Sequence, residues 1–80
     1  MNEQIHIGKL IQKKMEEDGR KVSWLAKKIP CHRNHIYQIY DQEHVNPVLI
    51  TKISFILKTN FFILYYEYVN EHIQEKNDKM

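Results

Sequence analysis

The apolar residues of this 80-residue chain recur at helical spacing in several separate stretches. The first stretch has Ile7, Leu10, Ile11 and Met15. Residues three or four positions apart share one face of a helix, so this pattern predicts a first helix from about Glu3 to Asp18 with an inner face in the core. Gly19 follows it, where a left-handed C-terminal cap commonly ends a helix.

Two shorter apolar stripes follow, with only residues 30–32 between them. Leu25, Ala26 and Ile29 form the first stripe, and Ile36 and Ile39 form the second. Helices joined by so short a turn cannot run antiparallel side by side and must cross at a steep angle. This layout is typical of a helix-turn-helix DNA reader, and it leaves the polar face of the second helix free to contact a partner.

The ends of the expected helices carry capping residues. Ser23 is expected to cap the second helix, and Lys27 and Lys28 then fall in its last turn, where the helix dipole favours cations. Asn46 and Pro47 are suited to open a fourth helix as the cap and the first helical residue. The fourth helix then has an apolar stripe at Leu49, Ile50, Ile53, Ile56 and Leu57.

A fifth helix is expected after Asn60, fraying in a polar tail from Glu71 to Met80. Its apolar residues are Phe61, Phe62, Leu64, Tyr65, Tyr68 and Val69. The chain therefore predicts an all-α domain over residues 1–70, followed by the tail over residues 71–80, with no strand and no internal repeat.

The fifth segment has more aromatic residues than so small a bundle needs. Two interpretations are open: the rings close the core, or some of them form a contact between two copies of the chain. The second interpretation predicts a homodimer through Phe61, Phe62, Tyr65 and Tyr68. A chain of this length is near the lower limit for a self-supporting core, which also favours a partner subunit.

Composition places the chain among folded domains of a reducing compartment. Apolar residues make up 42% and charged residues 28%. The lone cysteine, Cys31, excludes an intramolecular disulfide. No apolar run approaches the roughly 20 residues that span a bilayer, and the first residues lack the basic start of a signal peptide. We therefore expect a cytoplasmic protein without a membrane partner.

The net charge of +2 hides an uneven distribution along the chain. Most cations lie in one stretch: Lys9, Lys13, Lys14, Arg20, Lys21, Lys27, Lys28 and Arg33. From residue 59 onward the acidic residues Glu67, Glu71, Glu75 and Asp78 outnumber Lys76 and Lys79. A polyanion is a natural partner for the basic stretch, because lysines and arginines release the counterions condensed on phosphates. An ordinary solvated helix face is the alternative.

These residues resemble the Cro/cI-repressor (XRE) class of helix-turn-helix proteins. The class pattern is Leu-Ala-x-x-apolar, a small turn, then two isoleucines one helical turn apart. This chain has Leu25 to Ile29 for the first part, residues 30–32 for the turn, and then Ile36 and Ile39. With the fourth-helix pattern from Asn46 to Leu57, the resemblance covers roughly residues 5 to 69. It implies a compact five-helix domain similar to that of lambda repressor.

The resemblance also implies roles for the polar residues. In this class the second helix of the motif lies in the major groove and reads base edges. The matching outward positions are Arg33, Asn34, Tyr37 and Gln38, while Cys31, Ile36 and Ile39 match buried ones. An arginine can donate two hydrogen bonds to guanine, and an asparagine or glutamine can pair with adenine.

Further residues match phosphate-contacting positions or replace them. The class commonly opens the motif with a glutamine that holds a backbone phosphate, whereas this chain has Val22, so we expect Lys21, Ser23 or Lys27 to take that contact. The phosphate contacts expected in all are Lys21, Ser23, Lys27, Lys28, His32 and His35. His32, at the start of the helix, can instead cap it.

Two further departures from the class lie in its loops. Pro30 stands where the class usually has glycine, so we expect a locally different turn. The loop that follows the second helix of the motif, residues 41–44, is acidic where the class is often basic.

Other kinds of site have less support. Cys31, His32 and His35 are zinc-type ligands, but their spacing matches no zinc module and a fourth ligand is missing, so no metal or cofactor is expected. No triad context or phosphate-cradling glycine loop is present, and we do not expect an enzyme.

The expected function is sequence-specific binding of double-stranded DNA by a homodimer that regulates transcription as a repressor. The rival is a protein-interaction module with the same fold, such as an antitoxin or a phage adaptor, because a fold does not fix a function.

Overall fold

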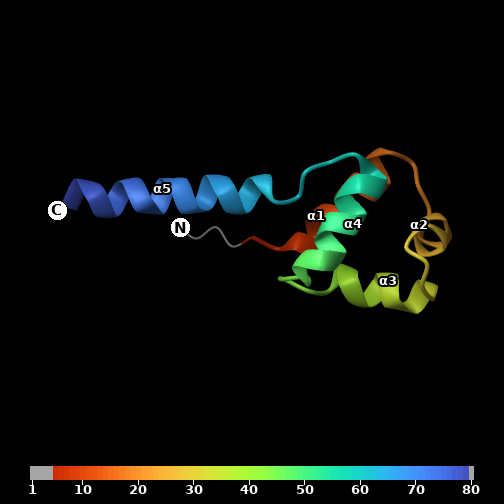
Figure 1. Ribbon diagram of the computed structural model, residues 1–80. Helices are drawn as coiled ribbons and strands as arrows, with labels where there is room; N and C mark the ends of the chain where they lie inside the picture. Colours follow the sequence, from red (N-terminus) through yellow and green to blue (C-terminus); the bar gives the residue numbers. More distant parts are fainter. Residues whose placement is uncertain (1–4, 80) are drawn as a thin grey trace.

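The computed structural model describes residues 5–79, with side chains described for residues 5–73, and this part of the chain is all-α. It contains the helices α1 (Ile7–Glu17), α2 (Val22–Lys28), α3 (Arg33–Tyr40), α4 (Pro47–Leu57) and α5 (Ile63–Lys79). Helices α1 to α4 gather into one body, and α5 extends away from it (Figure 1). The predicted all-α, five-helix architecture is confirmed. No helix within the described residues is both long and apolar enough to cross a membrane.

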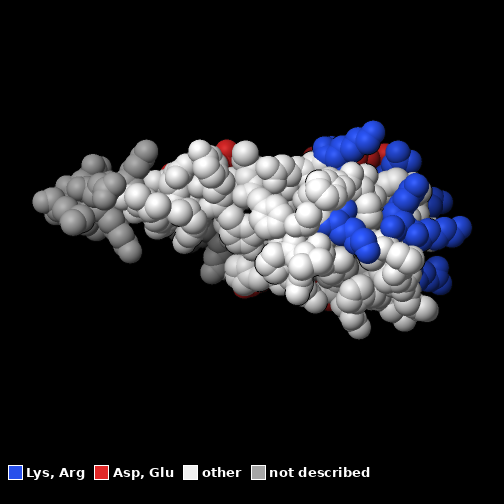
Figure 2. Space-filling view, in the orientation of Figure 1, with Lys and Arg blue, Asp and Glu red and all other residues white. Residues whose placement is uncertain are grey.

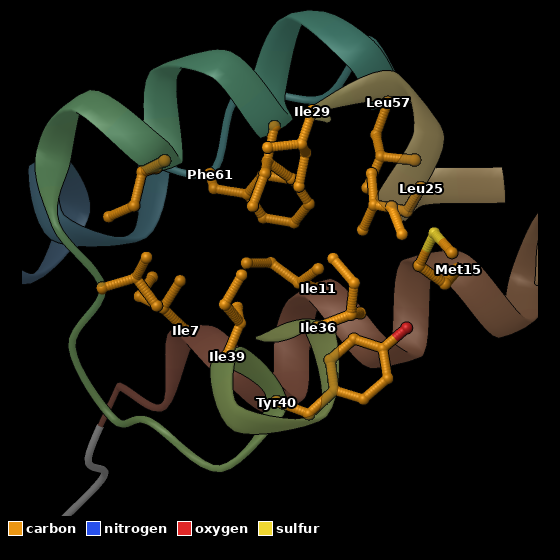
Figure 3. Close-up of a cluster of buried hydrophobic side chains, with 14 residues drawn as sticks. Ile7, Ile11, Met15, Leu25, Ile29, Ile36, Ile39, Tyr40, Leu57 and Phe61 are labelled. Carbon is orange, nitrogen blue, oxygen red and sulfur yellow. The ribbon is translucent and has the colours of Figure 1, made fainter. Parts of the chain in front are cut away.

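One cluster of apolar side chains holds the body together (Figure 3). The side chains come from helices α1 to α4 and from the segments on either side of α4. The buried members of the cluster are Ile7, Ile11, Met15, Leu25, Ala26, Ile29, Ile36, Ile39, Tyr40, Val45, Ile50, Ile53, Leu57 and Phe61. The stripes expected from helical spacing therefore do point inward. Among the described residues no charged side chain is buried, so burial of apolar surface is the main stabilising contribution to this core.

The first turn of α1 lies directly against the end of α3. The backbone N–H groups of Ile7 and Gly8 donate to the carbonyl oxygens of Glu43 and Gln42, both over 2.9 Å. A Cβ atom at Gly8 would collide with the carbonyl oxygens of Ile39 and Tyr40. Only glycine allows this approach, and the sequence pattern gave no sign of it.

Several predicted helix ends are confirmed. Gly19 has a φ of +68° after α1. The Asn46 Oδ1 accepts from the Val48 N–H over 2.8 Å, with Pro47 in the first turn of α4. The turn between α2 and α3 includes a cis peptide bond between Ile29 and Pro30.

Two expected helix starts are wrong. Helix α2 already begins at Val22, so Ser23 lies inside its first turn, and the capping position is Lys21, which makes no side-chain capping bond. The N-cap of α1 is His6, whose Nδ1 accepts from the Lys9 N–H over 3.1 Å; the expected start near Glu3 lies outside the described residues.

The start and length of the fifth helix also differ from expectation. Phe61 and Phe62 precede α5 in a turn, where the Asn60 Oδ1 accepts from the Phe62 N–H over 2.9 Å. The helix then continues through Glu71 to Lys79 instead of fraying at Glu71, so the boundary expected after residue 70 falls inside α5.

We predict that Gly8→Ala lowers the free energy of unfolding by about 3 kcal/mol, the upper end of the cost of overpacking, because the obstructing atoms belong to the backbone. Urea unfolding followed by circular dichroism measures it. Gly19→Ala is the matched control: its positive φ costs about 1 kcal/mol, but nothing occupies the added space. Equal losses in the two variants would contradict a close helix contact at Gly8.

Candidate nucleic-acid interface

Helix α3 buries one side and presents the other to solvent. Ile36, Ile39 and Tyr40 are buried. At about 100° per residue, the opposite direction falls on Asn34 and Gln38, which are therefore central on the outer face. Arg33 and Tyr37 lie on one flank of this face, and His35 lies on the other. All five of these outward residues are exposed, as the sequence predicted.

The start of α3 is fixed by its own histidine. The Nδ1 of His32 accepts from the Asn34 N–H over 3.1 Å, so this ring caps the helix. Because Nδ1 is an acceptor here, the ring proton of the neutral imidazole is on Nε2, from which it can donate outward. The cap also holds the backbone of Asn34 in place on the outer face.

A groove opens between the end of α1, the start of α2 and the flank of α3 that carries Arg33. We call it the basic groove; it has a volume of about 410 Å³. Its lining includes Gln12, Glu16, Arg20, Lys21, Ser23, Arg33, Tyr37 and Tyr40. Three cations thus face one carboxylate, Glu16: Arg20 and Lys21 from the connection between α1 and α2, and Arg33 from α3. Such a surface attracts an anion that extends along it, such as a phosphate backbone.

Two tyrosine side chains, Tyr37 and Tyr40, line part of the basic groove. Tyr37 and Tyr40 meet edge to face, with ring centroids 6.3 Å apart. Burial raises the pKa of Tyr40 above its ordinary value, and the charge of Glu16 and the neighbouring Tyr37 raise it further. The Tyr40 hydroxyl therefore remains a neutral group at physiological pH and adds no negative charge to the groove.

The structure divides the expected phosphate-contacting residues. Lys21 and Ser23 share the basic groove with Arg33 and Tyr37. Lys28 lies elsewhere, with its Nζ 5.8 Å from the centroid of the Trp24 ring. Lys27 and His35 are exposed, but neither residue lines the basic groove or lies over the Trp24 ring. The structure therefore does not bring them together with the groove residues.

Arg20 is a groove residue that the sequence placed in the basic stretch but not among the expected phosphate contacts. Its Cζ lies 4.4 Å from the centroid of the Trp24 ring, which holds the guanidinium beside the start of α2. Its signals in the sequence were its membership of the basic stretch and its place after Gly19. Its proximity to Arg33 depends on how α1 and α3 pack.

The cysteine and histidine cluster is not arranged as a metal site. Cys31 is half-buried, so its expected full burial is wrong, and burial raises the pKa of its thiol, which disfavours the thiolate that a metal needs. The Nδ1 of His32 is occupied by the helix cap. Over the part of the chain that the structure describes, no three metal-ligating side chains gather.

Positive charge is unevenly distributed over the described surface. On the face shown in Figure 2, lysine and arginine side chains gather at the end that carries α2, away from α5. Asp41 and Glu43, from the acidic loop after α3, are exposed at the other end of that helix. The basic groove and the outer face of α3 therefore form a continuous candidate interface at one end of the molecule.

Comparisons of the chain with family models, curated proteins and solved structures find no match.

We predict that His32→Ala lowers the free energy of unfolding by about 1 kcal/mol, because the Asn34 N–H loses its capping acceptor. Chemical unfolding measures the loss. His32→Asp restores a capping oxygen and should recover most of the stability, while His35→Ala, an exposed histidine within the same helix, should change it little. A similar loss in His35→Ala would contradict the capping role.

Proposed function

We propose that this protein binds double-stranded DNA through α3 and regulates transcription as a homodimer, in the manner of a repressor, in the cytoplasm. The observation that carries the proposal is the position of the basic groove beside an exposed helix whose central residues are an asparagine and a glutamine. The first feature suits phosphates, and the second suits base edges.

The basic groove is proposed to hold the DNA backbone. Arg20, Lys21 and Arg33 supply the positive charge, and the Ser23 hydroxyl supplies a neutral donor. Lys27, Lys28, His32 and His35 are proposed as further phosphate contacts around the same end of the molecule. Contacts of this kind position the protein on the duplex and carry no sequence information of their own.

The outer face of α3 is proposed to read sequence. The helix has eight residues, and a major groove about 12 Å wide admits a helix side-on. Asn34 and Gln38 are placed to meet base edges directly, and Tyr37 can contact a thymine methyl group. Arg33 lies where the two surfaces meet, so it can reach either a guanine edge or a phosphate.

One α3 reaches only a few base pairs, which is why the proposal includes a dimer and a site with two half-sites. A protein-binding adaptor is the second candidate. It is favoured by two exposed apolar side chains on α4, Val48 and Phe55, which are 78% and 76% exposed. The proposed DNA contacts do not involve Val48 or Phe55. An adaptor, in turn, would not require the basic groove.

We predict that duplex DNA binding weakens at least about tenfold between about 50 and 200 mM salt, because counterions are released on binding. Fluorescence anisotropy of a labelled duplex measures the affinity across the salt series. Binding that is absent at low salt, or that does not change with salt, would contradict the DNA proposal and favour the adaptor.

We predict that Arg33→Lys weakens binding to the preferred sequence by about 1–3 kcal/mol and relaxes one base position, because lysine keeps the charge but loses the two-pronged contact with guanine. Selection of preferred sequences from a random duplex library, followed by affinity measurements, tests this.

Lys21→Gln is the control variant for this prediction. It removes a charge from the same groove and should weaken all sequences about equally. A uniform loss in Arg33→Lys, or a sequence-selective loss in Lys21→Gln, would show that the two roles are exchanged.

A further inference from the structure

A second pocket lies on the far side of α2 from the basic groove. We call it the Trp24 pocket; it has a volume of about 390 Å³ and lies where the end of α1, helix α2 and the end of α4 meet (Figure 1). Of the α2 residues, Val22 and Ser23 line the basic groove, whereas Trp24 and Lys28 line this pocket. At about 100° per residue, the two pairs point in opposite directions from the helix axis. The Trp24 pocket is therefore a separate site.

Three cations line the Trp24 pocket: Arg20 from the α1–α2 connection, Lys28 from α2, and Lys58 from the end of α4. The one carboxylate in its lining, Asp18, is held by Lys14, with 3.3 Å between the Lys14 Nζ and the Asp18 Oδ1. That is the only ion pair among the residues whose side chains the structure describes. The three cations are thus gathered without a paired carboxylate, and an anion between them would relieve their mutual repulsion.

Trp24 holds two of these cations in place. The Arg20 Cζ lies 4.4 Å and the Lys28 Nζ 5.8 Å from the centroid of the indole ring. The attraction between a cation and the face of an aromatic ring offsets part of the repulsion between the two side chains. Because the ring already orders both positive groups, an anion that binds them pays a smaller entropic cost.

The backbone of Lys58 is in a conformation that glycine adopts more easily. Its φ is +54°, and among the described residues it is the only one other than glycine with a positive φ. Glycine is usual at such a helix end because it has no Cβ atom. Strained residues of this kind cluster at binding sites. The strain at Lys58 is explained if its ammonium group binds a ligand.

The end of α4 does not cancel the positive charge of the pocket. The last carbonyl oxygens of a helix carry partial negative charge. Here Thr59 engages two of them: its N–H donates to the Ser54 carbonyl oxygen over 3.0 Å, and its hydroxyl donates to the Leu57 carbonyl oxygen over 3.1 Å. The cations of the pocket therefore remain available to an external anion.

We propose that the Trp24 pocket binds a small phosphomonoester, a molecule with a phosphate group on an apolar or aromatic body. A phosphate group has about two negative charges and three acceptor oxygens, which suits three cations better than a carboxylate does. Trp24, Ile56 and Leu57 form an apolar wall for the body of the ligand. A volume of about 390 Å³ is near the lower end of the range for small-ligand sites, about 300–1,000 Å³.

The position of the pocket favours a small ligand over the DNA backbone. Duplex DNA is stiff over the length of one small domain. A duplex that lies along the basic groove therefore does not follow the surface round to the opposite side of α2. The apolar wall also has no counterpart in a phosphate backbone, which is polar and charged along its length.

Arg20 connects the two sites, because it lines both the Trp24 pocket and the basic groove. A phosphomonoester in the pocket engages the guanidinium that the proposed function assigns to DNA, and it adds negative charge that repels the DNA phosphates. We therefore expect ligand and DNA to weaken each other's binding. This consequence rests on the function proposed above, whereas the ligand site itself does not.

The pocket shares no residue with the expected dimer contact. Of the residues expected there, Phe61 belongs to the core and is 4% exposed, so its part in that expectation is wrong. Phe62 and Tyr65 pack against the core and are half-buried, and Tyr68 is exposed. None of these four residues lines the Trp24 pocket. A ligand in the pocket and a second copy of the chain therefore do not compete.

Trp24 is the single tryptophan, so its signals report directly on the pocket. Phenyl phosphate is the probe, added at constant ionic strength and followed by Trp24 fluorescence and by the indole N–H resonance. Both signals should saturate with a dissociation constant below about 1 mM. Inorganic phosphate should bind at least about fivefold more weakly, because it buries no apolar surface. Benzyl alcohol, which has no phosphate group, should give no saturable change.

Two variants test the cations. Lys28→Gln and Lys58→Gly should each raise the dissociation constant for phenyl phosphate at least about fivefold, because each removes a charged donor. Lys58→Gly also relieves the positive φ, so its loss of affinity cannot be attributed to a weakened fold. Lys52→Gln is the matched control: Lys52 is an exposed lysine of α4 that does not line the pocket, and its replacement should leave the dissociation constant unchanged.

Three results would overturn the ligand site: no saturable change with phenyl phosphate, equal binding of benzyl alcohol, or equal weakening by Lys52→Gln. A shift of the indole resonance with duplex DNA but none with phenyl phosphate would also overturn it and would assign the pocket to the DNA backbone.

The competition with DNA is measured separately. Saturating phenyl phosphate should weaken duplex binding at least about fivefold at matched ionic strength, and Lys58→Gly should abolish this effect. Ligand binding without any effect on duplex binding would overturn the competition. A chain that binds phenyl phosphate but no duplex would overturn the proposed function and support the ligand site.

Discussion

The contact between the first turn of α1 and the end of α3 is the constraint on which the arrangement of the body depends. Two backbone N–H groups, of Ile7 and Gly8, donate to the carbonyl oxygens that follow α3. They give these loop carbonyls hydrogen-bond partners where the chain leaves α3. Because Gly8 has no side chain, the helices come close enough for Ile7 and Ile11 to enter the same cluster as Ile36 and Ile39 (Figure 3).

The candidate interface follows from that arrangement. The core contains Ile36, Ile39 and Tyr40 of α3. Their burial determines which face of the helix points outward, and Asn34 and Gln38 lie at the centre of that face. The same packing carries the end of α1 past α3. After the turn at Gly19, Arg20 and Lys21 of the α1–α2 connection lie beside the flank of α3, and the basic groove forms there. The groove is thus a consequence of how three helices meet.

The periodicity of the sequence was sufficient to predict the helices and their inner faces, since spacing along a helix is a local property. Residue-level predictions held where the cause was local, as for the caps of Asn46 and His32. They were wrong where one residue of register decides the outcome: α2 begins at Val22, so Ser23 cannot cap it. Two arrangements of distant residues have no periodic signal: the contact of Gly8 with the end of α3, and the shared groove of Arg20 and Arg33.

The aromatic segment shows why composition alone could not locate a surface. Phe61 and Phe62 precede α5, and the turn at Asn60 directs Phe61 into the core. The exposed apolar residues of this segment lie instead on α5, where they are exposed because the helix extends beyond the body. The two ends of the molecule therefore differ in chemistry: the surface of α5 is apolar and acidic, and the surface beside α3 is basic (Figure 2). Because these surfaces share no residue and lie at opposite ends, a partner on one leaves the other accessible.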